Sequence, residues 1–116
     1  FIPRGAERPG WIISVTNDAW FGGGSGPYQH YAMARYRAIE EGLPLARSAS
    51  GGISAIVDSY GREVRATSRR GGFAEAQIPP ALVETTLARW GNILLLGLLV
   101  MLGSLRFFPR RQITKG

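Results

Sequence analysis

A run of fifteen residues without a charged side chain, residues 91–105, constrains this chain of 116 residues more than any other feature. Asn92 and Ser104 are its only clearly polar side chains. Extended to Phe108, the segment would form about 27 Å of α-helix, against about 30 Å of bilayer hydrocarbon. The alternative, a buried helix of a soluble core, normally shows a polar face, and this run has none. We therefore expect one transmembrane helix over residues 85–108.

The charges on either side of this segment predict its orientation. The formal net charge is +6, and Glu84 is the last acidic residue of the chain. A basic tail follows the apolar run, and the positive-inside rule places this tail, residues 109–116, in the cytoplasm. The preceding residues would then lie on the periplasmic side of a Gram-negative inner membrane. This clustering favours a membrane partner over nucleic acid, since no basic face interleaved with aromatic residues is present. The basic residues after the run are Arg106, Arg110, Arg111 and Lys115.

Residues 1–84 show the alternation of elements that is typical of a mixed α/β fold. A short β-branched run at 11–16 predicts a buried strand in a sheet covered on both faces. Pro27 and Gly42 are typical start and stop signals, and they bound a predicted helix at 27–41. The turn signal at residues 58–61 predicts a hairpin. The remaining predicted strands are 43–48, 53–57, 62–67 and 73–78.

Polar residues follow the first predicted strand at the position where open α/β sheets place their sites. Asn17 and Asp18 stand there, and their alternative role is only to close a turn. His30 is the only histidine, and its place early in the helix predicts a solvent-facing or capping residue. The chain contains no cysteine, which excludes a disulfide, a zinc–thiolate site and a cysteine nucleophile within these residues. We expect no metal and no cofactor.

Six blocks, taken in order, resemble the apolipoprotein N-acyltransferase branch of the nitrilase superfamily. Each block alone is unspecific, but their order is specific and covers nearly the whole chain, which ends in one apolar segment as that family does. The blocks are residues 15–22 (VTNDAWFG), 26–30 (GPYQH), 33–40 (MARYRAIE), 43–48 (LPLARS), 51–55 (GGISA) and 58–61 (DSYG).

The resemblance implies that residues 1–84 are the C-terminal part of a nitrilase-like αββα sandwich followed by one transmembrane helix. It implies transfer of a fatty acyl chain from a phospholipid to the N-terminal amine of a diacylated lipoprotein. In that family a Cys nucleophile, a Glu base and an oxyanion-stabilising Lys act through a thioester acyl-enzyme. None of the three maps onto this chain, so we expect the catalytic residues upstream of Phe1. The substrate-pocket residues implied here are Asn17, Asp18, Trp20, Phe21 and Arg47.

Two other functions stay open at this point. A membrane-tethered nitrilase relative that cleaves the C–N bond of a small amide would share the fold, although the apolar segment argues for a lipid substrate. A small membrane-anchored module without catalysis would explain the missing cysteine, but not the block at residues 17–22 or the first residue, Phe1. We expect a chain truncated from a longer enzyme, and we expect the 116 residues alone to be inactive and poorly folded because a sheet without its neighbouring strands has unpaired edges.

Overall fold

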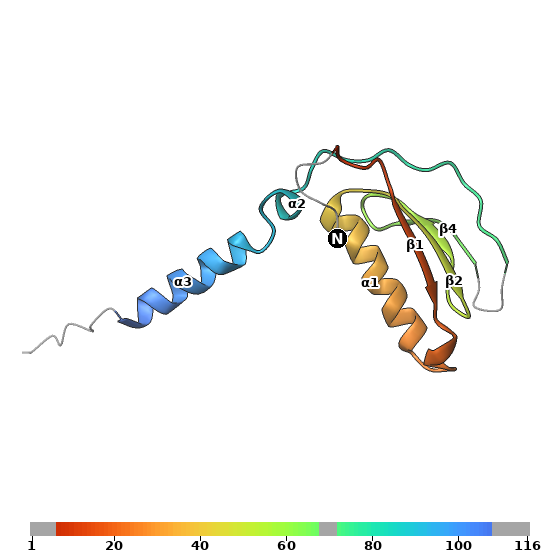
Figure 1. Cartoon of the computed structure of the whole chain (residues 1–116), viewed down its shortest axis with the longest axis horizontal. Coiled ribbons are helices and arrows are strands. Elements are labelled where there is room, and N and C mark those ends of the chain that lie inside the picture. Colours follow the sequence, from red (N-terminus) through yellow and green to blue (C-terminus); the bar gives the residue numbers. More distant parts are fainter. Residues whose placement is uncertain (1–6, 68–71, 108–116) are drawn as a thin grey trace, which may run out of the picture.

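The computed structural model describes residues 7–67 and 72–107, in which one four-stranded sheet lies beside one long helix (Figure 1). The strand order is β1-β2-β3-β4. This arrangement confirms the mixed α/β fold. The elements are β1 (Ile12–Asn17), the 3₁₀ turn η1 (Ala19–Phe21), α1 (Gly26–Glu41), β2 (Leu45–Ser50), β3 (Ala55–Val57), β4 (Glu63–Ala66), α2 (Thr86–Trp90) and α3 (Ile93–Phe107).

A βαβ unit forms the first half of the fold. β1 and β2 are parallel, with Ser14 opposite Arg47 and Asn17 opposite Ser50, and α1 connects them. Pro27 occupies the first turn of α1, and Gly42 ends the helix in the left-handed conformation with a φ of 64°. Both are the signals that predicted this helix, so its bounds are confirmed to within one residue.

One side of α1 covers the sheet and forms the core. Tyr31 and Ala38 of the helix are buried against three apolar residues of the strands, Leu45, Ala55 and Val57. Burial of the larger side chains, Leu45 and Val57, contributes roughly 1.5–3 kcal/mol each to the stability of the fold. The packing of α1 therefore fixes the position of its first turns over the end of β1, which matters for the site below.

The predicted hairpin is confirmed as the antiparallel pair β3 and β4. Asp58 organises its turn, because Oδ1 accepts hydrogen bonds from the backbone N–H groups of Tyr60 and Arg62, each at 2.9 Å. Gly61 supplies the positive φ of 77° that the turn requires. All four residues of β4 are exposed.

Two predictions about the sheet were wrong for the described residues. Residues 73–78 form no strand; they belong to an irregular segment that runs back toward α2 (Figure 1). That segment is held by single contacts, such as the bond from Ser59 Oγ to Pro80 O, and not by a ladder. The described residues also cover only one face of β1, since Ile13 and Val15 are exposed while the alternate residues are partly buried. A continuous apolar run in the sequence does not distinguish a strand covered on both faces from a strand covered on one face.

The apolar C-terminal segment is helical but interrupted. Gly91, with a φ of 53°, separates α2 from α3, and α3 projects away from the sheet (Figure 1). Its apolar side chains, among them Leu96 and Val100, are exposed. Within the described part of the chain, no helix has both the length and the apolar character that a membrane crossing needs. The predicted basic tail, residues 109–116, lies outside the described residues, as does Phe108.

Candidate functional site

The carboxyl end of β1 carries a fully buried carboxylate, that of Asp18. Its side chain is 0% exposed, and both of its oxygens are bonded. Oδ1 lies 2.8 Å from Nδ1 of His30, and Oδ2 accepts a hydrogen bond of 2.8 Å from Nη2 of Arg47. The backbone N–H of Asp18 also donates to Ser50 O, so the residue is fixed to the end of β2. A strand, its neighbour and a helix thus meet at one side chain.

Arg47 is the buried counter-ion of Asp18. It lies on the α1 side of β2, opposite Ser14 of β1, and its side chain is 1% exposed. Besides the bond to Asp18, Nε donates to Ile53 O at 3.3 Å and Nη1 donates to Ser14 Oγ at 3.4 Å. The whole guanidinium is therefore used in fixed contacts, as a buried charge requires. Arg47 is thus a buried residue of the sheet.

Close packing surrounds this ion pair. The ring of Phe21 lies 5.6 Å from that of His30. A Cβ on Gly26 would come within 2.9 Å of three atoms of the Phe21 side chain, and one on Gly51 would lie 2.9 Å from Ala19 Cα. Glycine is needed at both positions because the η1 turn leaves no room for a side chain. The turn is therefore held against α1 on one side and against the β2–β3 loop on the other.

The structure brings together three of the five predicted pocket residues. Asp18 and Arg47 are paired directly, and Phe21 joins them through His30. Asn17 does close a turn, because its Oδ1 accepts a hydrogen bond of 3.0 Å from Ala19 N. Trp20 lies apart from this cluster, since it is 81% exposed at the outer side of η1. The cluster therefore anchors a turn that presents a tryptophan to its surroundings.

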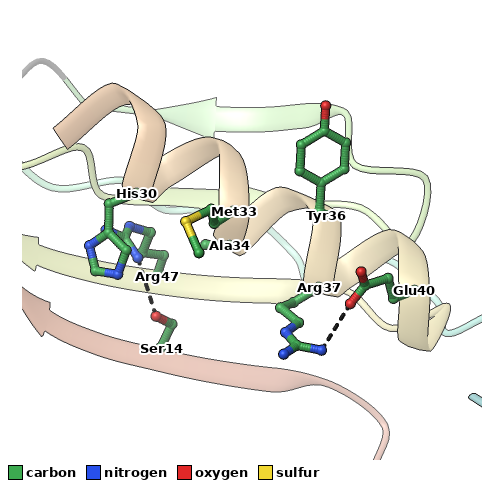
Figure 2. A pocket seen from close by; sticks show the side chains of 8 residues that line it. All are labelled: Ser14, His30, Met33, Ala34, Tyr36, Arg37, Glu40 and Arg47. Atoms are coloured by element: carbon green, nitrogen blue, oxygen red, sulfur yellow. Dashed lines mark hydrogen bonds and ion pairs between the residues drawn. The ribbon is translucent and has the colours of Figure 1, made fainter. Parts of the chain in front are cut away.

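A cavity of about 500 Å³ lies between α1 and the first strands (Figure 2). Arg47 is the one predicted pocket residue that lines it; the other four are absent from its wall. Figure 2 shows His30 beside Arg47, and it shows Ser14 bonded to Arg47 at the floor. The wall thus combines polar groups of the strands with apolar groups of the helix and with the ion pair that Arg37 forms with Glu40 at 2.9 Å. Its main lining residues are Ser14, His30, Met33, Tyr36, Arg37 and Arg47.

Sequence reasoning assigned His30 wrongly. It was predicted to be a solvent-facing or capping residue, but it is bonded to Asp18 and its side chain is only 35% exposed. Gly52 was missed too, although a Cβ there would overlap the Asp18 carboxylate. One signal for His30 was available: a helix that follows a strand in a βαβ unit begins near that strand's carboxyl end. A polar residue in its first turns therefore lies near Asp18.

The electrostatics of the cluster favour an ionised Asp18. Burial opposes the charge, but the hydrogen bond from His30 and the charge and hydrogen bond of Arg47 outweigh it, so the pKa of Asp18 is below its ordinary value. The described residues contain no group of three or more His, Asp or Glu placed to hold a metal ion. The cluster can position neighbouring groups and accept or donate hydrogen bonds.

A lowered pKa for Asp18 makes the stability of the fold depend on acid pH. A carboxyl group with a depressed folded-state pKa stabilises the protein above its unfolded-state pKa, which is about 4 for Asp, and the effect is lost as the pH falls through the folded-state value. We expect the free energy of unfolding to decline below about pH 4. Urea denaturation at a series of pH values should show a shallower decline for Asp18→Asn, and equal slopes would contradict this assignment.

Comparison with known proteins places this geometry in a family. The carbon-nitrogen hydrolase family model matches residues 4–87, which include the whole sheet, α1 and the Asp18 cluster. The chain is 48% identical over 110 residues to the apolipoprotein N-acyltransferase of Bradyrhizobium diazoefficiens, and 45% identical over 112 residues to that of Rhodopseudomonas palustris. These matches cover 91% and 93% of this chain.

A shorter match with higher identity occurs with the apolipoprotein N-acyltransferase of Brucella melitensis, which is 65% identical over 51 residues, or 44% of this chain. The chain spans about a fifth of the length of its long-matching relatives, 20% and 21% for the first two. The resemblance predicted from six ordered blocks is thus confirmed over most of the chain. With a family match that extends over the strand end, the helix and the hairpin together, the chain belongs to the carbon-nitrogen hydrolase family.

Proposed function

We propose that this chain is the C-terminal region of an acyltransferase that moves a fatty acyl chain from a phospholipid to the N-terminal amine of a diacylated lipoprotein. The observation that carries the proposal is the similarity to named apolipoprotein N-acyltransferases over 91% of the chain. The buried cluster at the carboxyl end of β1 supports it, because open α/β sheets place their sites at that end.

The chemistry would divide between this chain and residues outside it. A cysteine thiolate would attack the ester carbonyl of the phospholipid, break its C–O bond and form a thioester, with the lysophospholipid leaving after it takes up a proton. The lipoprotein amine would then attack the thioester, lose a proton and restore the thiol. The sequence contains no cysteine, so the nucleophile is assigned upstream of Phe1, together with the Glu base and the Lys. The 116 residues alone are then inactive.

The contribution of this chain would be the wall of the acyl-thioester pocket. Trp20 and Phe21 supply apolar rings for the acyl chain, and Asn17, Asp18 and Arg47 hold the turn that carries them. The support is that the exposed Trp20 stands two residues after the buried, bonded Asp18 and next to the turn that Asn17 closes. A turn fixed in this way loses little conformational entropy when a substrate binds.

We place the protein in the bacterial inner membrane, with residues 1–84 in a nitrilase-like αββα sandwich on the periplasmic side and the C-terminus in the cytoplasm. Residues 85–108 would be the transmembrane segment in the intact protein. Support comes from the absence of charge between Gly91 and Leu105 and from the exposed apolar side chains of α3. The basic residues after this segment support the orientation.

The test begins with the coding sequence upstream of Phe1, where we expect an open frame that contains a cysteine, a lysine, a glutamate and several apolar segments. The full-length protein is then purified in detergent and mixed with phospholipid vesicles and a diacylated lipopeptide that has a free N-terminal amine. We expect the lipopeptide to gain the mass of one acyl chain. A cysteine-to-alanine variant and the 116 residues alone should transfer nothing.

Two results would overturn the proposal. Hydrolysis of small amides without transfer to the lipopeptide would favour the amidase, and a start codon beside Phe1 would favour a module without catalysis. The amide and lipopeptide assays use the same purified protein, and the start codon is read from the coding sequence. The three functions therefore give different results.

A further inference from the structure

The contact between His30 and Asp18 determines which nitrogen of the imidazole carries a hydrogen. The Asp18 carboxylate is ionised and can only accept, and it lies 2.8 Å from Nδ1 of His30. Nδ1 must therefore carry the hydrogen and donate it. Arg47 Nη2 also lies 3.3 Å from Nδ1, but arginine has no acceptor, so this approach is not a hydrogen bond when Nδ1 is protonated. In the neutral ring, Nε2 then carries the free lone pair.

The ring is also fixed in orientation. Asp18 holds it at Nδ1, and the Phe21 ring packs beside it with centroids 5.6 Å apart. Asp18 is itself held by Arg47 and by its backbone bond to Ser50 O. The two nitrogens of an imidazole point in diverging directions, so Nε2 is directed away from the buried carboxylate. The His30 side chain is 35% exposed, and His30 lines the cavity. A lone pair is thus presented at a defined point of the cavity.

An acceptor at this point distinguishes between the two substrates of the proposed reaction. The reacting ester of the phospholipid offers only oxygen acceptors, and a lone pair cannot bond to them. The amine of the acceptor lipoprotein offers N–H donors, which Nε2 can accept. The polar groups nearest His30 on the cavity floor, Arg47 and Ser14, are already bonded to each other and to the sheet. The carboxylate of Glu40, which also lines the cavity, is engaged by Arg37 at 2.9 Å. His30 is thus the acceptor for an incoming amine at the end of the cavity near Asp18.

We propose that His30 is a binding residue for the acceptor amine, through a hydrogen bond from that amine to Nε2, and that Asp18 is the positioning residue that fixes the imidazole for it. This inference rests on the proposed acyl transfer and deepens it. It assigns the strand-end cluster to the second half of the reaction, after the thioester has formed. It also explains why a buried carboxylate with two partners is placed beside a partly exposed ring.

The test uses His30→Asn in the full-length protein. The Asn side-chain amide can replace Nδ1–H as a donor to Asp18, but it has no group at the position of Nε2. We expect transfer from the thioester to the lipopeptide to slow about 2- to 10-fold, the loss expected for one hydrogen bond between neutral groups. The KM for the lipopeptide should rise, thioester formation from phospholipid should keep its rate, and the acylated enzyme should accumulate.

Two further variants separate binding from folding. Gln29→Ala changes the exposed neighbour on the same helix and should leave both half-reactions unchanged. His30→Gln places an amide oxygen near the position of Nε2 and should recover part of the transfer rate. Unchanged transfer in His30→Asn would overturn the inference, and so would equal slowing of both half-reactions. Wild-type protein that forms no thioester would instead contradict the proposed function, which keeps the two failures distinct.

Discussion

Replacing Arg47 by methionine is expected to lower the free energy of unfolding by about 3–5 kcal/mol, the range for removing one partner of a buried ion pair. Methionine keeps much of the aliphatic volume, so the loss is electrostatic and not a cavity effect. Asp18, with no exposed surface, would keep His30 and the more distant Thr16 hydroxyl, at 3.4 Å, as its side-chain partners. The Ile53 carbonyl would also lose its donor. Urea denaturation of the purified full-length protein at neutral pH measures the change.

An exposed ion pair in the same chain provides the control. Arg62 donates to Asp58 at 2.7 Å, a shorter distance than the buried pair, but the Arg62 side chain is 73% exposed. Arg62→Met should therefore cost no more than about 1 kcal/mol. The double variant Arg47→Met, Asp18→Asn should be less destabilised than the sum of its two single changes, because it removes both charges together. Equal losses for Arg47→Met and Arg62→Met would contradict the assignment of a buried pair.

The local parts of the fold were predictable because short-range signals determine them. Pro27 and Gly42 act through their own backbone preferences and bound α1 in any tertiary setting. The hairpin turn depends on Asp58, which accepts from N–H groups two and four residues later. The prediction for residues 73–78 failed because a suitable sequence forms a strand only when it also forms a hydrogen-bond ladder with a neighbour. Among the described residues this segment forms no such ladder, although β1 and β4 are edge strands.

Two residues of the Asp18 cluster were singled out from the sequence, but not their arrangement. Asp18 and Arg47 were each identified, the first from its place after a strand and the second from the family resemblance. Their pairing depends on the parallel register that sets Ser14 opposite Arg47, and this register joins residues 33 positions apart in the chain. His30 enters the cluster only because α1 packs with its first turns above the end of β1. The βαβ order indicates that these turns lie near the end of β1, but the contact of His30 with Asp18 depends on the packing of α1 against the sheet.

Replacing Gly52 by alanine is expected to destabilise the protein by about 3 kcal/mol, the upper end of the range for overpacking. An added Cβ would overlap Asp18 Oδ2 and lie 2.8 Å from both Cβ and Cγ of that residue. Asp18 has little freedom to move aside, since Arg47, His30 and Ser50 all hold it. The alanine would therefore displace either the β2–β3 loop or the ion pair itself. Thermal unfolding of the full-length protein measures the loss.

Gly24→Ala is the matched control for this prediction. Gly24 lies in the loop before α1, a Cβ there would meet nothing within 4 Å, and its φ is not positive. The change should stay within about 0.5 kcal/mol of wild type, as surface substitutions usually do. If Gly52→Ala proves as harmless as Gly24→Ala, then the β2–β3 loop yields easily and does not hold Asp18 in place. If Gly52→Ala loses as much stability as Arg47→Met and slows transfer to the lipopeptide as His30→Asn does, then the loop, the ion pair and His30 act as one unit.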